Sequence, residues 1–109
     1  MTPISTAVNT PGTAIKVGKN PGYITFAPNG RTAYVSNQGS GTVTPVSSAT
    51  NKPGRATKGV TGPIAITRDG MIIYARNGTS TVSPVSTATN NAGKPIKVAY
   101  NPLEIVIAP

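Results

Sequence analysis

The chain has 109 residues, with 12 Gly, 11 Pro, a formal net charge of +8, and neither Cys nor His. These counts exclude disulfides, thiolate metal sites, Cys nucleophiles and His general bases, and they leave Asp69 and Glu104 as the only side-chain carboxylates. Abundant Gly and Pro with few charged side chains favour many short strands, although such a composition also approaches that of disordered chains.

The sequence contains no apolar run near the roughly 20 residues that a membrane-spanning helix needs. Its N-terminus also lacks the basic and then apolar pattern of a signal peptide. We therefore expect no membrane span, while a leader on a longer precursor stays open.

A unit of about forty residues recurs along the chain. The unit that begins at Thr2 starts again 42 residues later at Thr44 and 39 residues after that at Ser83. The single domain, residues 1–109, is therefore divided into repeat units 2–43, 44–82 and 83–109, the last of them partial. A period near forty is typical of blades or solenoid units, whose copies bury their faces against one another.

The first predicted element is a third strand that includes Thr2-Pro3-Ile4, and an outer strand over residues 15–17 follows it. An inner strand follows, in which Ile24 and Phe26 alternate with other residues at strand spacing. The dipeptide Asn29-Gly30 suits a tight hairpin turn into a second strand over residues 33–35.

After residues 37–41 the chain is predicted to turn into a third strand around Val43. The second copy of the pattern comprises an outer strand over 56–59, the inner pair Ile64 and Ile66, the Asp69-Gly70 turn, a strand over 72–75, the Asn77-Gly78 turn and a third strand around Val82. The third copy comprises an outer strand over 96–98 and an inner pair Ile105 and Ile107. Four such strands make one blade. Pro3, Pro45 and Pro84 fall inside the third strands, which predicts a bulge or a strand end there. The outer strand over 56–59 is much less apolar than its counterparts, so it is expected to fray.

Residues 20–37 read Asn-Pro-Gly-Tyr-Ile-Thr-Phe-Ala-Pro-Asn-Gly-Arg-Thr-Ala-Tyr-Val-Ser-Asn, and they resemble the hallmark segment of YVTN-type β-propeller repeats. The tetrapeptide at 34–37 differs from the family's by one residue, and its second copy at 74–77 differs by two. The resemblance implies an all-β fold of propeller blades with four antiparallel strands, incomplete in one chain and completed by oligomerisation or by missing blades. It also implies a bacterial cell-surface or secreted location, and it transfers no catalytic motif.

Five basic residues recur at matching positions of the repeat. Lys16, Lys58 and Lys97 share one position, and Arg55 and Lys94 share another. Stacked blades would align them, so these five are the candidate residues for weak, salt-sensitive binding of a polyanion such as nucleic acid. The favoured alternative is that outer strands carry Lys to stay soluble and discourage edge pairing, because no aromatic residues interleave the stripe.

Other polar and aromatic residues favour structural roles. Asp69 is predicted in a turn, where its side chain can bond to its own backbone, and Tyr34 and Tyr74 suit packing on a half-buried strand. The Asn77-Gly78-Thr79 triplet matches a glycosylation acceptor but is better explained as a turn.

The sequence thus predicts a non-enzymatic scaffold or interaction module, without metal or cofactor, whose loops and blade faces bind a protein or glycan partner. The alternatives are a basic module that binds polyanions or nucleic acid, and a fragment of a lactonase-like propeller hydrolase. Since about two and a half units leave faces and strand edges open, self-association into a homo-oligomer is also expected.

Overall fold

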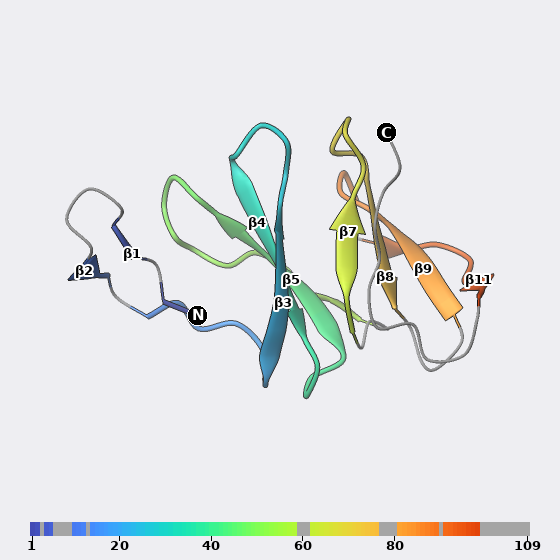
Figure 1. Ribbon diagram of the computed structural model, residues 1–109, viewed down its shortest axis with the longest axis horizontal. Helices are drawn as coiled ribbons and strands as arrows, with labels where there is room; N and C mark the ends of the chain where they lie inside the picture. Colours follow the sequence, from blue (N-terminus) through green and yellow to red (C-terminus); the bar gives the residue numbers. More distant parts are fainter. Residues whose placement is uncertain are drawn as a thin grey trace.

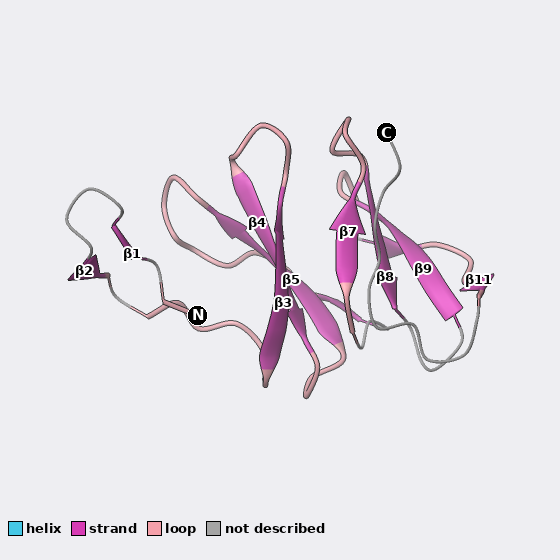
Figure 2. Cartoon of the chain, in the orientation of Figure 1, coloured by secondary structure: helices cyan, strands magenta, loops and turns pink. Residues whose placement is uncertain are grey.

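The computed structural model describes residues 1–2, 4–5, 10–12, 14–58, 62–76, 81–89 and 91–98. Across these ranges the chain forms strands, turns and loops and no helix, as Figure 2 shows. In the described part no helix is long and apolar enough to cross a membrane. The all-β prediction is confirmed.

Two sheets of antiparallel strands dominate the molecule, and they stand face to face (Figure 1). Blade 1 has the strand order β3 (Pro21–Phe26), β4 (Thr32–Asn37), β5 (Thr42–Ser47) and β6 (Thr57–Lys58). Blade 2 has β7 (Ile64–Ile66), β8 (Ile72–Arg76) and β9 (Thr81–Ser86), with β10 (Asn91–Ala92) and β11 (Ile96–Lys97) both paired to the outer edge of β9. A third, two-stranded sheet joins β1 (Ile4–Ser5) to β2 (Thr10–Pro11).

The hairpin turn at the start of each blade is the one predicted. Gly30 and Gly70 take left-handed φ values of 73° and 74°, which suit glycine because it has no Cβ. The Gly30 amide donates to the Ala27 carbonyl at 2.8 Å, and the Gly70 amide donates to that of Thr67 at 2.9 Å. The two blades therefore begin with the same turn, one repeat apart.

The bulge or strand end predicted at Pro45 and Pro84 is wrong, because β5 and β9 run straight through them. The same prediction at Pro3 lies outside the described residues. Pro45 lies opposite Tyr34, and Pro84 lies opposite Tyr74, with no register shift. The carbonyl of Pro45 accepts a bond of 2.7 Å from the Gly54 amide on its outer side. Since the nitrogen and oxygen of one strand residue point to the same edge, the missing N–H of proline also faces outward and no bond to β4 is lost.

The outer strands are short. In the described part of 56–59 only β6 forms, as expected of a frayed strand, whereas the strand expected over 96–98 is reduced to β11. The strand expected over 15–17 does not form, and Ile15 alone pairs with Met1 through backbone bonds of 2.6 and 3.2 Å. The Asn77-Gly78 turn and the inner strand at Ile105 and Ile107 lie outside the described residues.

The described residues among the first 15 repeat the pairing of the outer part of a blade. Met1 and Ile15 pair as Val43 and Thr57 do one repeat later. In the same way, Ile4 lies opposite Pro11 as Val46 lies opposite Pro53. We call β1, β2 and the Met1–Ile15 pair the N-terminal half-blade, which stands on the side of blade 1 away from blade 2 (Figure 1).

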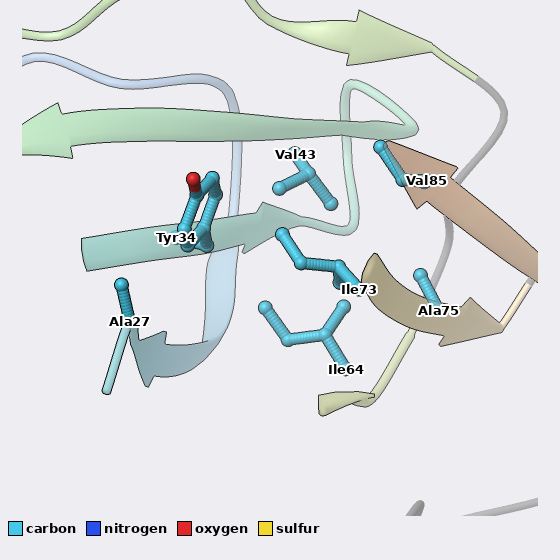
Figure 3. Close-up of a cluster of buried hydrophobic side chains, with 7 residues drawn as sticks. All are labelled: Ala27, Tyr34, Val43, Ile64, Ile73, Ala75 and Val85. Carbon is cyan, nitrogen blue, oxygen red and sulfur yellow. The ribbon is translucent and has the colours of Figure 1, made fainter. Parts of the chain in front are cut away.

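The main core lies between the two blades (Figure 3). Its buried residues are Ala27, Tyr34 and Val43 from blade 1 and Ile64, Ile73, Ala75 and Val85 from blade 2. Tyr34 packs as predicted, and its burial raises the pKa of the phenol. A second cluster, Ile15, Ala33, Val35 and Val46, covers part of the opposite face of blade 1.

Candidate interaction surface

Large apolar side chains are exposed on the face of blade 1 that points away from blade 2. Ile24 and Phe26 on β3 are 53% and 57% exposed. They border a hollow of about 280 Å³ whose lining also includes Met1, Ile15, Ala33 and Val46. We call this surface, built on β3 with its hollow, the open face. An exposed apolar patch of this kind marks a contact surface more often than isolated apolar residues do.

The equivalent face of blade 2 is covered, and the comparison shows what the open face lacks. Ile64, one repeat after Ile24, is only 9% exposed, and Ile66, one repeat after Phe26, is partly buried against the main core. The cover comes from blade 1, because β3 lies against β7 and Tyr23, Ala27 and Tyr34 belong to the same cluster as Ile64. We call the face of each blade that carries these alternating apolar residues its receiving face. In the described chain, the receiving face of blade 2 is covered by the inner strands of blade 1, and that of blade 1 is not covered by any inner strand.

Buried polar contacts join the strands of blade 1 to one another and to blade 2. The amide nitrogen of Asn37, a fully buried residue, donates to the hydroxyls of Thr42 and Thr44 at 3.1 and 2.9 Å. These bonds close the turn between β4 and β5. The hydroxyl of Ser36 donates to the carbonyl of Gly62 at 2.7 Å and links the two blades across the core.

The five predicted basic residues are all exposed, but they do not form one cluster. Arg55 and Lys58 line a groove of about 490 Å³ at the outer edges of both blades, between β6 and β10. The guanidinium of Arg55 donates there to the Thr89 carbonyl at 3.1 Å and to Asn91 Oδ1 at 3.4 Å. Lys16 instead lines one hollow beside the N-terminal half-blade and another beside β5. Lys94 and Lys97 lie at the outer edge of blade 2.

The carboxylate of Asp69 accepts hydrogen bonds from residues of its own hairpin turn. Its Oδ1 accepts from the Thr67 hydroxyl at 2.6 Å and from the Met71 amide at 3.0 Å, and these bonds hold its pKa below the ordinary value. Glu104 and the Asn77-Gly78-Thr79 triplet lie outside the described residues. Within the described ranges, no three His, Cys, Asp or Glu side chains come together as metal ligands would.

Sequence reasoning identified Ile24 and Phe26 only as strand residues and did not predict their exposure. Alternation shows that both side chains point to one face, but it does not show whether a neighbour covers that face. No local signal separates Ile24 and Phe26 from Ile64 and Ile66, which share their repeat positions.

Comparison with solved structures identifies the fold. Hydrazine synthase from Kuenenia stuttgartiensis matches with a TM-score of 0.75 and 29% identity over 85% of this chain and 27% of that chain. The Cps50 (Swd1) β-propeller domain of Myceliophteria thermophila matches with a TM-score of 0.71 and 12% identity over 82% and 29%. A candidate 6-phosphogluconolactonase from Bacteroides uniformis matches with a TM-score of 0.60 and 24% identity over 89% and 32%.

The two sheets are β-propeller blades. The chain spans about a third or less of the length of these similar proteins. No protein-family model matches the chain, and no curated protein matches it. The neighbours include proteins named as enzymes and one named only as a β-propeller domain, so the comparison establishes the fold and leaves the activity undecided.

Proposed function

We propose that this chain is a non-enzymatic interaction module of the propeller type, and that the open face binds its partner. The observation that carries the proposal is the exposure of Ile24 and Phe26 on a strand whose equivalent in blade 2 is covered. Removing such side chains from water favours binding by about 25 cal/mol for each Å² of apolar surface buried. The strands beneath them are already paired into a sheet, so we expect little additional backbone ordering on binding.

We further propose that the repeat is of the YVTN type. Its support is that Tyr34-Val35-Ser36-Asn37 falls on β4 and supplies three structural functions. The Tyr34 ring packs in the main core, the Ser36 hydroxyl bonds across to blade 2, and the Asn37 amide closes the next turn. These contacts give the tetrapeptide a role in packing and hydrogen bonding, and not in catalysis or ligand binding.

A second candidate function is the binding of polyanions in the groove between β6 and β10. Its support is that Arg55 and Lys58 line this groove together in a chain of net charge +8. The Arg55 guanidinium is already bonded to Thr89 and Asn91, which orients it but leaves it less free to bind phosphate. Binding at this groove should weaken steeply between low and moderate salt, because counterion release drives it.

Binding of the chain to a library of displayed peptides and to a glycan array tests the proposal. We expect ligands whose capture is lost when Phe26→Asp places a charge on the open face and is kept in Met71→Asp. Met71 is the matched control because it is 64% exposed on blade 2, outside the open face. Capture that survives Phe26→Asp and fails in Lys58→Ala at low salt would favour the polyanion function, and lactone hydrolysis by the unmodified chain would favour an enzyme.

A further inference from the structure

A hollow of about 560 Å³ beside β5 is lined by two chain segments, residues 16–18 and residues 53, 54 and 56. The rest of its lining is Ser40, Thr42 and Thr44, which bring three hydroxyl groups to it. These hydroxyls line neither the hollow of the open face nor the groove between β6 and β10. We call this site the hydroxyl hollow. It is separate from the proposed interaction function and does not depend on the apolar contacts of the open face.

The three hydroxyl oxygens already accept hydrogen bonds from elsewhere in the chain. Asn37 Nδ2 donates to Thr42 Oγ1 at 3.1 Å and to Thr44 Oγ1 at 2.9 Å. The backbone amide of Lys19 donates to Ser40 Oγ at 2.7 Å. A hydroxyl group carries one proton besides its lone pairs, and no described residue accepts the proton of any of these three. All three protons are therefore available to a ligand in the hollow.

The threonine pair is held in place from the interior of blade 1. Asn37 is fully buried, and Thr44 is only 4% exposed. Thr42 and Thr44 stand two residues apart on β5, so their side chains project from the same face of the sheet. The Val35 carbonyl also accepts from Asn37 Nδ2 at 3.4 Å, and since a carbonyl cannot donate, the nitrogen of the amide must face this side. The two threonine hydroxyls are thus set as donors before any ligand binds.

The segment that carries Lys16 packs closely against these groups. A Cβ atom on Gly18 would lie 2.7 Å from Asn37 Cγ and 2.8 Å from Ser40 Oγ, so glycine permits an approach that a side chain would prevent. Lys16 is exposed and lines the hollow, and its ammonium group has three donors and no acceptor. No carboxylate side chain belongs to the described lining. Every polar side chain of the hollow can therefore donate, and the one charge among them is positive.

We propose that the hydroxyl hollow binds a small oxyanion, a carboxylate or phosphate group, which Lys16 neutralises while the Thr42 and Thr44 hydroxyls donate to its oxygens. A ligand of this class brings negative charge and several acceptor oxygens to a lining of donors. Hydrogen bonds to an ionised acceptor are shorter and stronger than bonds between neutral groups. Because neutral hydroxyls supply most of the contacts, binding should depend on the hydroxyls as well as on charge.

Nuclear magnetic resonance of the isotope-labelled full chain tests this proposal, with inorganic phosphate and acetate as two separate probes. Sodium chloride holds the ionic strength constant in both titrations, because salt screens the general attraction of anions to a chain of net charge +8. We expect saturable shifts of the amide signals of Gly18, Thr42 and Thr44. The probe with the lower Kd identifies the preferred oxyanion as phosphate or carboxylate.

Matched variants separate the hollow from general charge. Lys16→Ala should raise the Kd about fivefold or more, whereas Lys58→Ala removes the same charge from the equivalent repeat position and should change it less than about twofold. Thr42→Val removes one donor, keeps the shape and should raise the Kd by about the same factor as Lys16→Ala. Thr42→Ser should keep the original Kd, as should Thr32→Val, which removes a half-buried hydroxyl of β4 outside the lining.

The amide spectrum of each variant should remain that of the folded chain. Lys16 is exposed, so Lys16→Ala keeps the test decisive even if Thr42→Val unfolds. Shifts that rise without saturation, or an equal loss of affinity in Lys16→Ala and Lys58→Ala, would overturn the proposal, because both indicate general attraction of anions. An unchanged Kd in a folded Thr42→Val chain would overturn it as well, because the hydroxyls would then contribute nothing to binding.

Discussion

The first three strands of blades 1 and 2 have the same order and the same starting turn, but the receiving faces of the two blades differ in exposure. Ile64 on β7 is 9% exposed, whereas Ile24 at the equivalent position on β3 is 53% exposed. The local sequence is similar in the two places, since two large apolar residues flank a smaller one in both. The difference arises from what lies in front of each sheet.

In a repeat architecture each unit buries its face only against its neighbours, so stability depends on interfaces between units as well as on the units themselves. Blade 2 gains its core from blade 1, and blade 1 gains a smaller second cluster from Met1, Ile15 and Val17 of the N-terminal region. The main core should therefore carry most of the stability of the described chain, and the open face should carry most of its capacity to bind.

The largest effect is expected at the centre of the main core. Ile73 is 1% exposed and lies among residues of both blades (Figure 3). Ile73→Ala should lower the free energy of unfolding by about 2–5 kcal/mol, because it removes buried methyl groups and leaves a cavity. Urea denaturation followed by circular dichroism measures this loss, and a loss below about 1 kcal/mol would show that the blades do not depend on their interface.

A paired substitution tests the comparison of the receiving faces directly. Ile64→Ala should lower the free energy of unfolding by about 2–3 kcal/mol, whereas Ile24→Ala should lower it by less than about 1 kcal/mol. Both changes remove the same atoms from the same repeat position. The difference between the two losses in free energy of unfolding therefore measures the effect of having another sheet packed over the residue. The measurement belongs at a protein concentration below any self-association, and equal losses for the two variants would contradict the difference in burial.

Much of the fold could be predicted from the sequence because the strongest signals are local. Alternation at Ile64 and Ile66 and the turn chemistry of Asn29-Gly30 and Asp69-Gly70 placed strands and hairpins correctly. The error at Pro45 had a different origin, because the cost of a missing N–H depends on which edge of the strand it faces. That orientation follows from pairing with β4 and with Gly54, which are 11 and 9 residues away at their matched positions.

The candidate surface was harder to predict than the strands. Exposure of Phe26 depends on whether another sheet stands over it, and the grouping of Arg55 with Lys58 depends on how β6 and β10 meet at the outer edge. Repeat register placed Lys16 and Lys58 at equivalent positions, but equivalent positions lie one blade apart and face different surroundings. Register alone therefore gives the position of a side chain within its blade and not its neighbours.

A smaller effect is expected for hydroxyl bonds that differ only in burial. The hydroxyl of Ser36 donates to the Gly62 carbonyl at 2.7 Å between the blades, and that of Ser48 donates to the Gly30 carbonyl at 2.7 Å in an exposed loop. Ser36→Ala should lower the free energy of unfolding by about 1–3 kcal/mol, because a buried carbonyl loses this donor and water cannot readily replace it. Ser48→Ala should change it by no more than about 0.5 kcal/mol, and chemical denaturation of both variants side by side would expose any reversal of that order.

The smallest effect concerns the starting turns, where the two blades use different chemistry for the same bond. Asn29 Oδ1 accepts from the Arg31 amide at 2.9 Å in blade 1, and Asp69 Oδ1 accepts from the Met71 amide at 3.0 Å in blade 2. The Thr67 hydroxyl and the Met71 amide lower the pKa of Asp69 in the folded chain below its ordinary value of 3.8. In the window between these two pKa values the unfolded chain binds more protons, so this contribution to stability is complete above the ordinary value and is lost as pH falls through the folded pKa.

Asp69→Asn should therefore flatten the fall of the denaturation midpoint with decreasing pH below about 4, since an amide oxygen can accept the same bond without titrating. Asn29→Asp is the reciprocal variant and should make the fall steeper, and a slope unchanged in both variants would show that neither turn contributes to acid sensitivity.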